Sequence, residues 1–223
     1  MINLSTLILC GAPNTVIPDI PTSACEHFGK VQRIIFQRCK NGATANTVGL
    51  GVGVAGAVLD AGASATWDTL TAATDATKAQ FSPFTESPAF TDGTIRTARG
   101  GNDSYGGVPI SLGYEPTEFE AQILSARQDV IAALKLLRNE DAYNLGVYLI
   151  SADGKLMATV NDVATPTILS PIPIQQFNIG NKVAGGYDDV DYNAISFQLE
   201  DNWSNTVATL PATDFAFDLL TYA

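Results

Sequence analysis

The chain has 223 residues, of which 46% are hydrophobic and only 16% are charged, and its formal net charge is −11. This length and apolar content allow one large domain with a substantial core. Lys and Arg number 12 against 23 Asp and Glu, which argues against a protein that reads nucleic acid, since such proteins neutralise phosphates with cations. No stretch approaches the ~18 apolar residues of a membrane-spanning helix. So few charges indicate a surface that is largely covered in use, as in a large assembly, or an extracellular β-protein.

The residues that most often carry chemistry form no recognisable constellation. The three cysteines, Cys10, Cys25 and Cys39, are an odd number, which argues against a closed disulfide framework. Their spacing with His27 matches none of the compact ligand pairs of zinc modules. His27 is the only histidine, and on a strand it would lie about 6–7 Å from Cys25, too far for a catalytic dyad. We therefore expect no enzyme, no metal site and no cofactor.

The first part of the chain, about residues 1–30, is expected to be an extended arm, because Pro13, Pro18 and Pro21 disfavour both helix and central strand. It lacks the positively charged start of a secretory signal. Val31–Arg38 follows with high β-branched and aromatic content and is expected to be a strand.

A loop-rich insertion is expected at about residues 42–105, and it contains an unusual run from Gly49 to Val54 in which glycine alternates with valine or leucine. The run has no charge and no proline, the usual guards of an exposed strand edge. It is either covered by another subunit or an internal strand under a close backbone contact. The candidate subunit-contact residues are Gly49, Leu50, Val52, Val54 and Val58.

Within the same insertion, Ser64–Thr74 is expected to be a short helix, with Ser64 as N-cap and Trp67 and Leu70 on one face. A glycine-rich loop, Gly100 to Gly107, leads into an apparent strand at Val108–Leu112. Glycine loops that cradle phosphate open a helix instead, so a nucleotide site is rejected.

The next stretch changes its hydrophobic period. Apolar and polar residues alternate over Phe119–Leu124, which indicates a strand, and from Val130 the apolar spacing becomes helical. A capping-box pattern at Ser125 and Gln128 coincides with this change, so a principal helix is expected at about 126–138. Its core-facing residues are expected to be Val130, Leu134 and Leu137.

The rest of the chain is expected to be β-rich. Leu145 to Val160 is predicted as a hairpin turning at Asp153-Gly154. The prolines in Thr165–Ile174 predict an edge strand or an extended connection, and Ala194–Leu199 alternates as a strand. The aspartates between Gly185 and Tyr192 lack the pattern of a calcium loop and are expected to be solvated.

These elements predict a mainly β (α+β) fold, with β-sandwich or barrel-like sheets, one principal flanking helix and long loops. We expect a single domain over residues 1–223, comprising the N-terminal arm and the loop-rich insertion.

The last two thirds of the chain resemble virion proteins of tailed bacteriophages, most closely tail tube, or major tail, proteins. The resemblance lies in the runs Phe81–Pro88, Arg99–Asp103, Gly106–Gly113 and Glu115–Thr117, with Val130–Leu137 and Phe197–Ser204 adding to it. It is a likeness of pattern, and no motif in it encodes a chemistry. It implies a β-sandwich with one flanking helix, in hexameric rings stacked into a hollow tube with an acidic lumen. The long stretch from Gly42 to Tyr105 departs from a minimal tube subunit and leaves a neck, tail-terminator or capsid-associated role open.

The sequence therefore predicts a structural subunit of a virion, built in the host cytoplasm, whose partners are its own copies, other virion proteins and, non-specifically, passing DNA. The alternative from another class is a ligand-binding β-sandwich on a cell surface. Only two tryptophans, Trp67 and Trp203, could supply its binding platform.

Overall fold

The computed structural model describes residues 28–51, 59–100, 107, 109–140, 142–163, 165–187 and 189–222. Within these residues the protein is mostly β, with two short α-helices, so the predicted mainly β (α+β) class is confirmed. The strands are β1 (Val31–Arg38), β2 (Lys40–Asn41), β3 (Thr44–Ala45), β4 (Val48–Gly49), β5 (Ala79–Phe81), β6 (Glu86–Thr91), β7 (Ile95–Ala98), β8 (Ile110–Tyr114), β9 (Thr117–Leu124), β10 (Leu145–Ser151), β11 (Leu156–Val160), β12 (Ile168–Ser170), β13 (Ile172–Val183), β14 (Tyr192–Leu199) and β15 (Val207–Leu210). The helices are α1 (Ser64–Ala72) and α2 (Gln128–Leu136), with short 3₁₀ turns η4 (Leu137–Asn139), η5 (Trp203–Thr206) and η6 (Ala212–Asp214).

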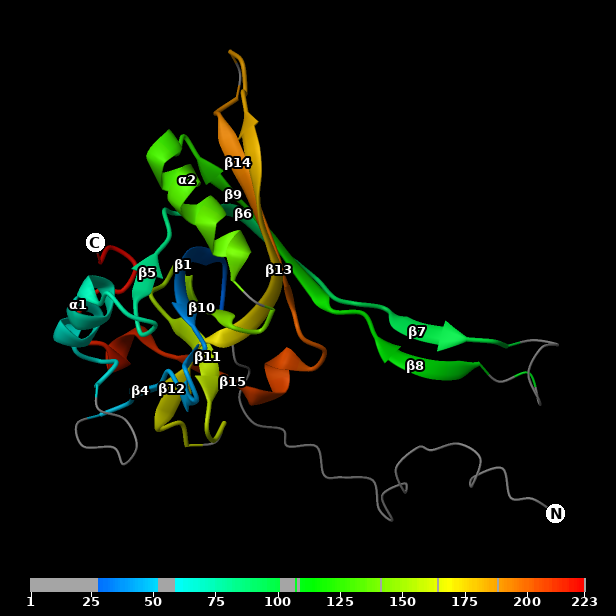
Figure 1. The fold of residues 1–223 in the computed structure, drawn as a ribbon, viewed down its shortest axis with the longest axis horizontal. Helices are drawn as coiled ribbons and strands as arrows, with labels where there is room; N and C mark the ends of the chain where they lie inside the picture. Colours follow the sequence, from blue (N-terminus) through cyan, green and yellow to red (C-terminus); the bar gives the residue numbers. More distant parts are fainter. Residues whose placement is uncertain are drawn as a thin grey trace.

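The large sheet is antiparallel and branches at β10 (Figure 1). One edge of β10 pairs with β1 along its length. Its other edge pairs with β13 near its start and with β11 near its end. The first branch continues through β14 and β9 to β6, and the second through β12 to β4, with β15 also on β11. Strand β10 is buried at every position, as expected for a strand covered on both faces.

Two hydrophobic clusters lie on the two faces of the β1–β10 pair. Ile34 and Phe36 enter the first cluster, which fills the space between β10, β13, β14, β9 and α2. Ile35 and Tyr148 enter the second, which α1 and the C-terminal segment cover. Successive residues of a strand point to opposite faces, so β1 contributes to both cores and holds them together.

Most of the predicted strands are present. Val31–Arg38 forms β1, Phe119–Leu124 lies within β9, and Ala194–Leu199 lies within β14. The hairpin predicted at Asp153-Gly154 is β10 and β11. The range 42–105, expected to be rich in loops, carries β3 to β7 and α1, and its strands β5 and β6 belong to the large sheet.

Thr165–Ile174 is predicted to be an edge strand or an extended connection, and the edge strand is wrong, because β12 lies between β11 and β4 and β13 lies between β10 and β14. Pro173 is accommodated as the second residue of β13, opposite Gly146, and pairing with β14 begins only at Ile174. Proline is tolerated at a strand start because the missing N–H is not needed there.

Helix α2 occupies the predicted range but begins two residues later than expected. Its N-cap is Arg127, and no side chain caps it. Ser125 has a positive φ of 47° and donates its N–H to Asp191 O, so the predicted capping box does not form. On the inward side of the helix, Ile131 and Leu134 are buried, whereas Val130 and Leu137 are partly buried against the first cluster.

Helix α1 is shorter than predicted. Ser64 is its first helical residue, and the N-cap is Ala63. The helix ends before Thr74 because Ala73 has an extended ψ of 145°. Trp67 and Leu70 are buried in the second cluster, as their spacing predicts.

Candidate assembly surfaces

A two-stranded ribbon, β7 and β8, projects from the body of the protein (Figure 1). It continues the path of β6 and β9, which pair inside the large sheet, but β7 and β8 form a separate sheet of their own. Among the described residues neither β7 nor β8 pairs with any third strand. Each strand therefore presents one open edge, and a lone two-stranded ribbon is marginally stable in water.

The ribbon is unusually apolar for an exposed element. Its large side chains are more than half exposed: Ile95 at 55%, Ile110 at 54%, Leu112 at 62% and Tyr114 at 51%. Scattered apolar side chains on a surface need no explanation, but these four come from one small projection. A gathered exposed apolar surface of this kind is typical of an interaction site.

The root of the ribbon is tightly fixed. Glu115 donates its N–H to Thr94 O at 3.0 Å, and Thr94 Oγ1 hydrogen-bonds Glu115 Oε2 at 2.9 Å. A Cβ on Gly93 would lie 1.7 Å from Glu115 O, so only glycine allows the two chains to approach this closely. The direction in which the ribbon leaves the body is thus set by a packed backbone contact.

The charges of the ribbon are opposite in sign to those of the chain. Arg96 lies in β7 and Arg99 follows it. Neither guanidinium forms an ion pair with any residue that the structure describes. In a chain of net charge −11, two unpaired cations on one projection favour contact with an acidic surface such as another copy provides.

A second projection is the tip of the β13–β14 hairpin, residues 183–187 and 189–191 (Figure 1). Val183, Tyr187 and Val190 are its exposed apolar residues, and Tyr187 is fully exposed at 108%. Asp191 closes the tip by accepting hydrogen bonds from Lys182 Nζ at 2.6 Å and the Gly185 N–H at 3.2 Å. These two bonds hold the pKa of Asp191 below its usual value. These bonds fix the base of the tip.

A groove of about 400 Å³ opens near the end of α2. Phe36, Leu137 and Leu145 form its apolar floor, while Gln37, Arg38, Thr74, Asp75, Ala76, Lys78, Gln80 and Glu140 complete its wall. Its lining comes from the end of β1, from the segment after α1 together with β5, and from η4 through the start of β10.

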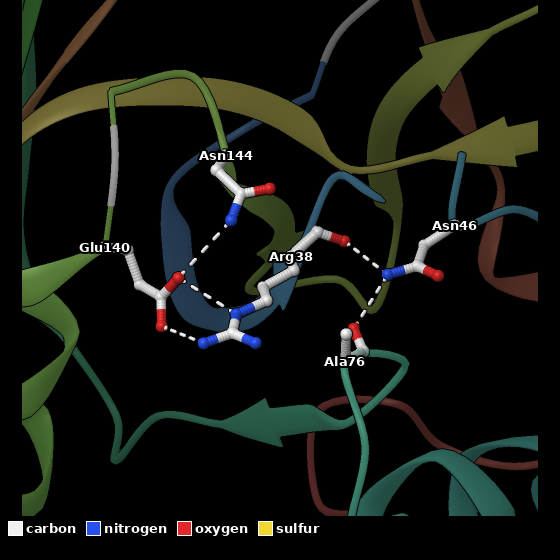
Figure 2. A network of polar contacts seen from close by, with 5 residues as sticks. All are labelled: Arg38, Asn46, Ala76, Glu140 and Asn144. Carbon is white, nitrogen blue, oxygen red and sulfur yellow. Dashed lines mark hydrogen bonds and ion pairs between the residues drawn. The ribbon is translucent and has the colours of Figure 1, made fainter. Parts of the chain in front are cut away.

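Figure 2 shows the polar contacts that tie these segments together. Arg38 binds Glu140 through two parallel hydrogen bonds of 2.6 and 2.9 Å, and Asn144 reaches the same carboxylate at 3.4 Å. Asn46 Nδ2 donates to Arg38 O and Ala76 O, both at 2.8 Å. Bidentate Arg–carboxylate pairs are geometrically specific. The Arg38–Glu140 pair therefore fixes the relative position of the segments on this side of the groove.

Two of the residues predicted to contact another subunit form backbone hydrogen bonds within their own chain. Gly49 is buried, donates its N–H to Leu59 O and accepts from the Ala61 N–H, each at 2.7 Å. Leu50 donates to Thr167 O and packs partly against the second cluster. The other three, Val52, Val54 and Val58, lie outside the described residues, and the subunit contact stays a prediction.

The helix residues are brought together as a set. Val130, Leu134 and Leu137 all lie against the first cluster, and Leu134 is the most buried of the three. Ile131, which the helical spacing from Val130 passes over, is buried more deeply still, at 2% exposure.

Sequence reasoning missed the ribbon, the tip and the groove. The ribbon does carry a signal: Ile95–Ala98 and Ile110–Tyr114 flank a glycine-rich stretch, which is a hairpin pattern. The groove carries none, because its residues are far apart in the sequence.

The remaining chemistry-bearing residues give no centre. Cys39 is half-buried, and its burial raises the pKa of the thiol to about 11. Cys10, Cys25 and His27 lie outside the described residues. Within the described part of the chain, no group of His, Cys, Asp and Glu is arranged to hold a metal ion, and no helix there has the length and hydropathy to cross a bilayer.

Comparison with known proteins does not identify a family for this chain. No protein-family model matches the chain, and no curated protein sequence matches it. Among solved structures, it is similar to a chain of the sixfold-symmetrised baseplate of the anti-feeding prophage, with 11% sequence identity and a TM-score of 0.33. The match covers 85% of this chain and 99% of that one. At so low a TM-score this match does not establish a shared fold.

Proposed function

We propose that this protein is a structural subunit that assembles with copies of itself, as a tail tube subunit of a phage-like virion. One observation carries the self-assembly: the β7–β8 ribbon, which exposes four large apolar side chains on a projection with two open strand edges. Natural proteins often cover exposed strand edges and large apolar patches. The ribbon combines both features on one projection, so we take it as the principal contact surface.

The composition supports the same proposal. Charged residues are only 16% of the chain, and a subunit whose surface is largely covered by neighbours needs fewer. The ribbon leaves one side of the body, and in this proposal it binds a site on a neighbour that differs from itself. Such a head-to-tail contact generates rings when its rotation closes. Three finer parts of the proposal come from the sequence resemblance alone. They are the tail tube itself, its hexameric rings, and its place in a virion that is assembled in the host cytoplasm.

The test uses the purified full-length chain, sedimentation velocity and negative-stain images. We expect rings or tubes from the parent chain. Leu112→Asp should remain monomeric, because it places a charge in the covered ribbon contact, and its melting temperature should equal that of the monomeric parent. A matched control is available in Val163→Asp, since Val163 is 51% exposed between β11 and β12, away from the ribbon.

We expect Val163→Asp to assemble like the parent. Normal assembly of Leu112→Asp would contradict the role of the ribbon. A parent chain that stays monomeric at all accessible concentrations would contradict the proposed function itself.

A further inference from the structure

We propose a second contact between copies: the β13–β14 tip of one copy inserts Tyr187 into the groove beside η4 of the next. This contact rests on the proposed self-assembly, and it involves no residue of the ribbon. It is heterologous, since a tip on one copy meets a groove on another.

The two surfaces lie at opposite ends of α2. At its start, Ser125 is tied to Asp191 at the base of the tip. At its end, Leu137 of η4 lines the groove. The nine residues of α2 span about 13 Å, and the tip extends away from them (Figure 1). A copy therefore cannot fill its own groove, whereas a neighbour in a repeating array can.

The groove suits an aromatic side chain that ends in a hydroxyl. Its volume of about 400 Å³ is within the range of sites that hold small ligands. The apolar floor formed by Phe36, Leu137 and Leu145 would cover the ring, and Gln80 and Thr74 at the wall offer polar partners for the hydroxyl. Aromatic anchors that are buried in such pockets dominate the energetics of protein interfaces.

Tyr187 is the side chain available for this role. Tyr187 is fully exposed at 108%, so its ring is not packed against its own copy. Lys182 and Asp191 hold the base of the turn that presents it. A preorganised loop loses less conformational freedom on binding, which favours its use as an anchor.

One cation of the groove matches one carboxylate of the tip. Glu140 is paired with Arg38, whereas Asp75 keeps its negative charge while it accepts hydrogen bonds from the N–H and hydroxyl of Thr77. Lys78, in the wall, forms no ion pair or side-chain hydrogen bond within the described residues.

Two further cations lie beside the groove in sequence, Arg138 after Leu137 and Lys40 two residues after Arg38. Asp189, next to the tip's apolar residues, is exposed and forms no ion pair. An ion pair between Asp189 of the tip and Lys78 of the groove is therefore electrostatically favourable.

The first experiment measures self-association of the full-length chain by sedimentation velocity. Tyr187→Ser and Lys78→Glu should each raise the apparent dissociation constant about tenfold or more, the effect of losing an interface anchor. Asp189→Lys should weaken association as well, and Asp189→Lys with Lys78→Asp should restore it. Val163→Ala, at a 51% exposed position between β11 and β12, is the control that should associate normally.

The second experiment locates the contact directly. Val190→Cys and Ala76→Cys variants, which keep Tyr187 and Lys78 and carry different affinity tags, are mixed and oxidised gently. A disulfide between the two tagged chains is expected, because such bonds form only when the two Cα atoms come within about 7 Å. Val190→Cys mixed with Val163→Cys controls for the native cysteines and should give no more cross-link than the parent chain.

Parent-like association of Tyr187→Ser and Lys78→Glu, or absence of the specific cross-link, would overturn the tip–groove contact. If the ribbon variant Leu112→Asp still blocks assembly in that case, the proposed function stands and only this contact is wrong. A parent chain that never associates overturns both.

Discussion

Gly93 controls where the ribbon points, because no other residue fits against Glu115 O. We predict that Gly93→Ala forces the ribbon root apart, at a cost of about 1–3 kcal/mol for overpacking, and impairs assembly while the β core stays folded. Circular dichroism and sedimentation velocity together check this. Gly180→Ala is the matched control in β13, since its Cβ would meet neighbours only at 3.5 Å or more. Undiminished assembly of Gly93→Ala would mean that the ribbon's direction is unimportant.

Leu134 anchors α2 against the first hydrophobic cluster, with 8% of its surface exposed. Leu134→Ala should lower the free energy of unfolding by about 2–5 kcal/mol, as other buried leucine truncations do. Leu136→Ala, two residues away and exposed, should change it by less than about 0.5 kcal/mol. Chemical denaturation measures both. A loss below about 0.5 kcal/mol for Leu134→Ala would show that this side of the helix carries little of the core.

At the scale of single elements, the turn of the β10–β11 hairpin makes stability depend on pH. Asp153 is bonded by Lys155 Nζ at 2.8 Å and by the Ser151 hydroxyl, and these contacts lower its pKa to about 2. Because the folded pKa lies below the unfolded value of about 4, the carboxylate stabilises the fold above that pH and loses this effect as pH falls toward 2.

We therefore predict that Asp153→Asn lowers the melting temperature at pH 6 and that the gap from the parent narrows steadily between pH 5 and pH 2. Thermal melts across this range test it. Asp201→Asn, an exposed aspartate in a turn with no ion pair among the described residues, is the control and should show no such trend. If the difference in melting temperature between the parent and Asp153→Asn is equal at pH 6 and pH 2, the Asp153 charge contributes nothing to the stability of the turn.

Sequence periodicity predicted the elements that have one buried face and one exposed face. Strand β9 alternates buried Phe119, Ala121 and Ile123 with exposed or half-buried neighbours, and that alternation is visible in the sequence. The change to helical period after Ser125 likewise marked α2. Predictions failed where a contact from elsewhere in the fold decides: Ser125 bonds to Asp191 instead of capping α2, and Pro173 is accommodated inside the sheet.

The candidate surfaces were less predictable than the fold. The groove draws Phe36, Lys78 and Leu137 from three separate segments, which only the folded chain brings together. The ribbon and the tip are local hairpins, yet sequence alone does not say that they stand clear of the body. The glycine–valine run from Gly49 drew attention for its lack of charge, and its described part proves to be bonded within the chain.

At the scale of the whole molecule, the charges are distributed unevenly. Five ion pairs within the described residues engage Lys30, Arg38, Arg127, Lys155 and Lys182. Arg33 is used internally, since its guanidinium donates to the carbonyls of Ser82 and Leu220. Among the cations without an ion pair in the described residues, Arg96 and Arg99 lie at the ribbon, Lys78 lines the groove, and Lys135 hydrogen-bonds Asn181. The rest of the surface is dominated by carboxylates, which favours contacts between unlike parts of identical copies.

The same distribution predicts how the chain treats DNA. Binding to duplex DNA requires several cations to neutralise adjacent phosphates and release counterions. With a net charge of −11 and its unpaired cations split between two separate surfaces, the chain should repel a duplex overall. We expect the purified protein to pass a duplex-DNA column unretained at about 150 mM salt, near physiological ionic strength. Retention that weakens steeply as salt rises would show real phosphate binding. Arg96→Glu with Arg99→Glu would then tell whether the ribbon causes it, and a conduit in which DNA slides freely would no longer fit this protein.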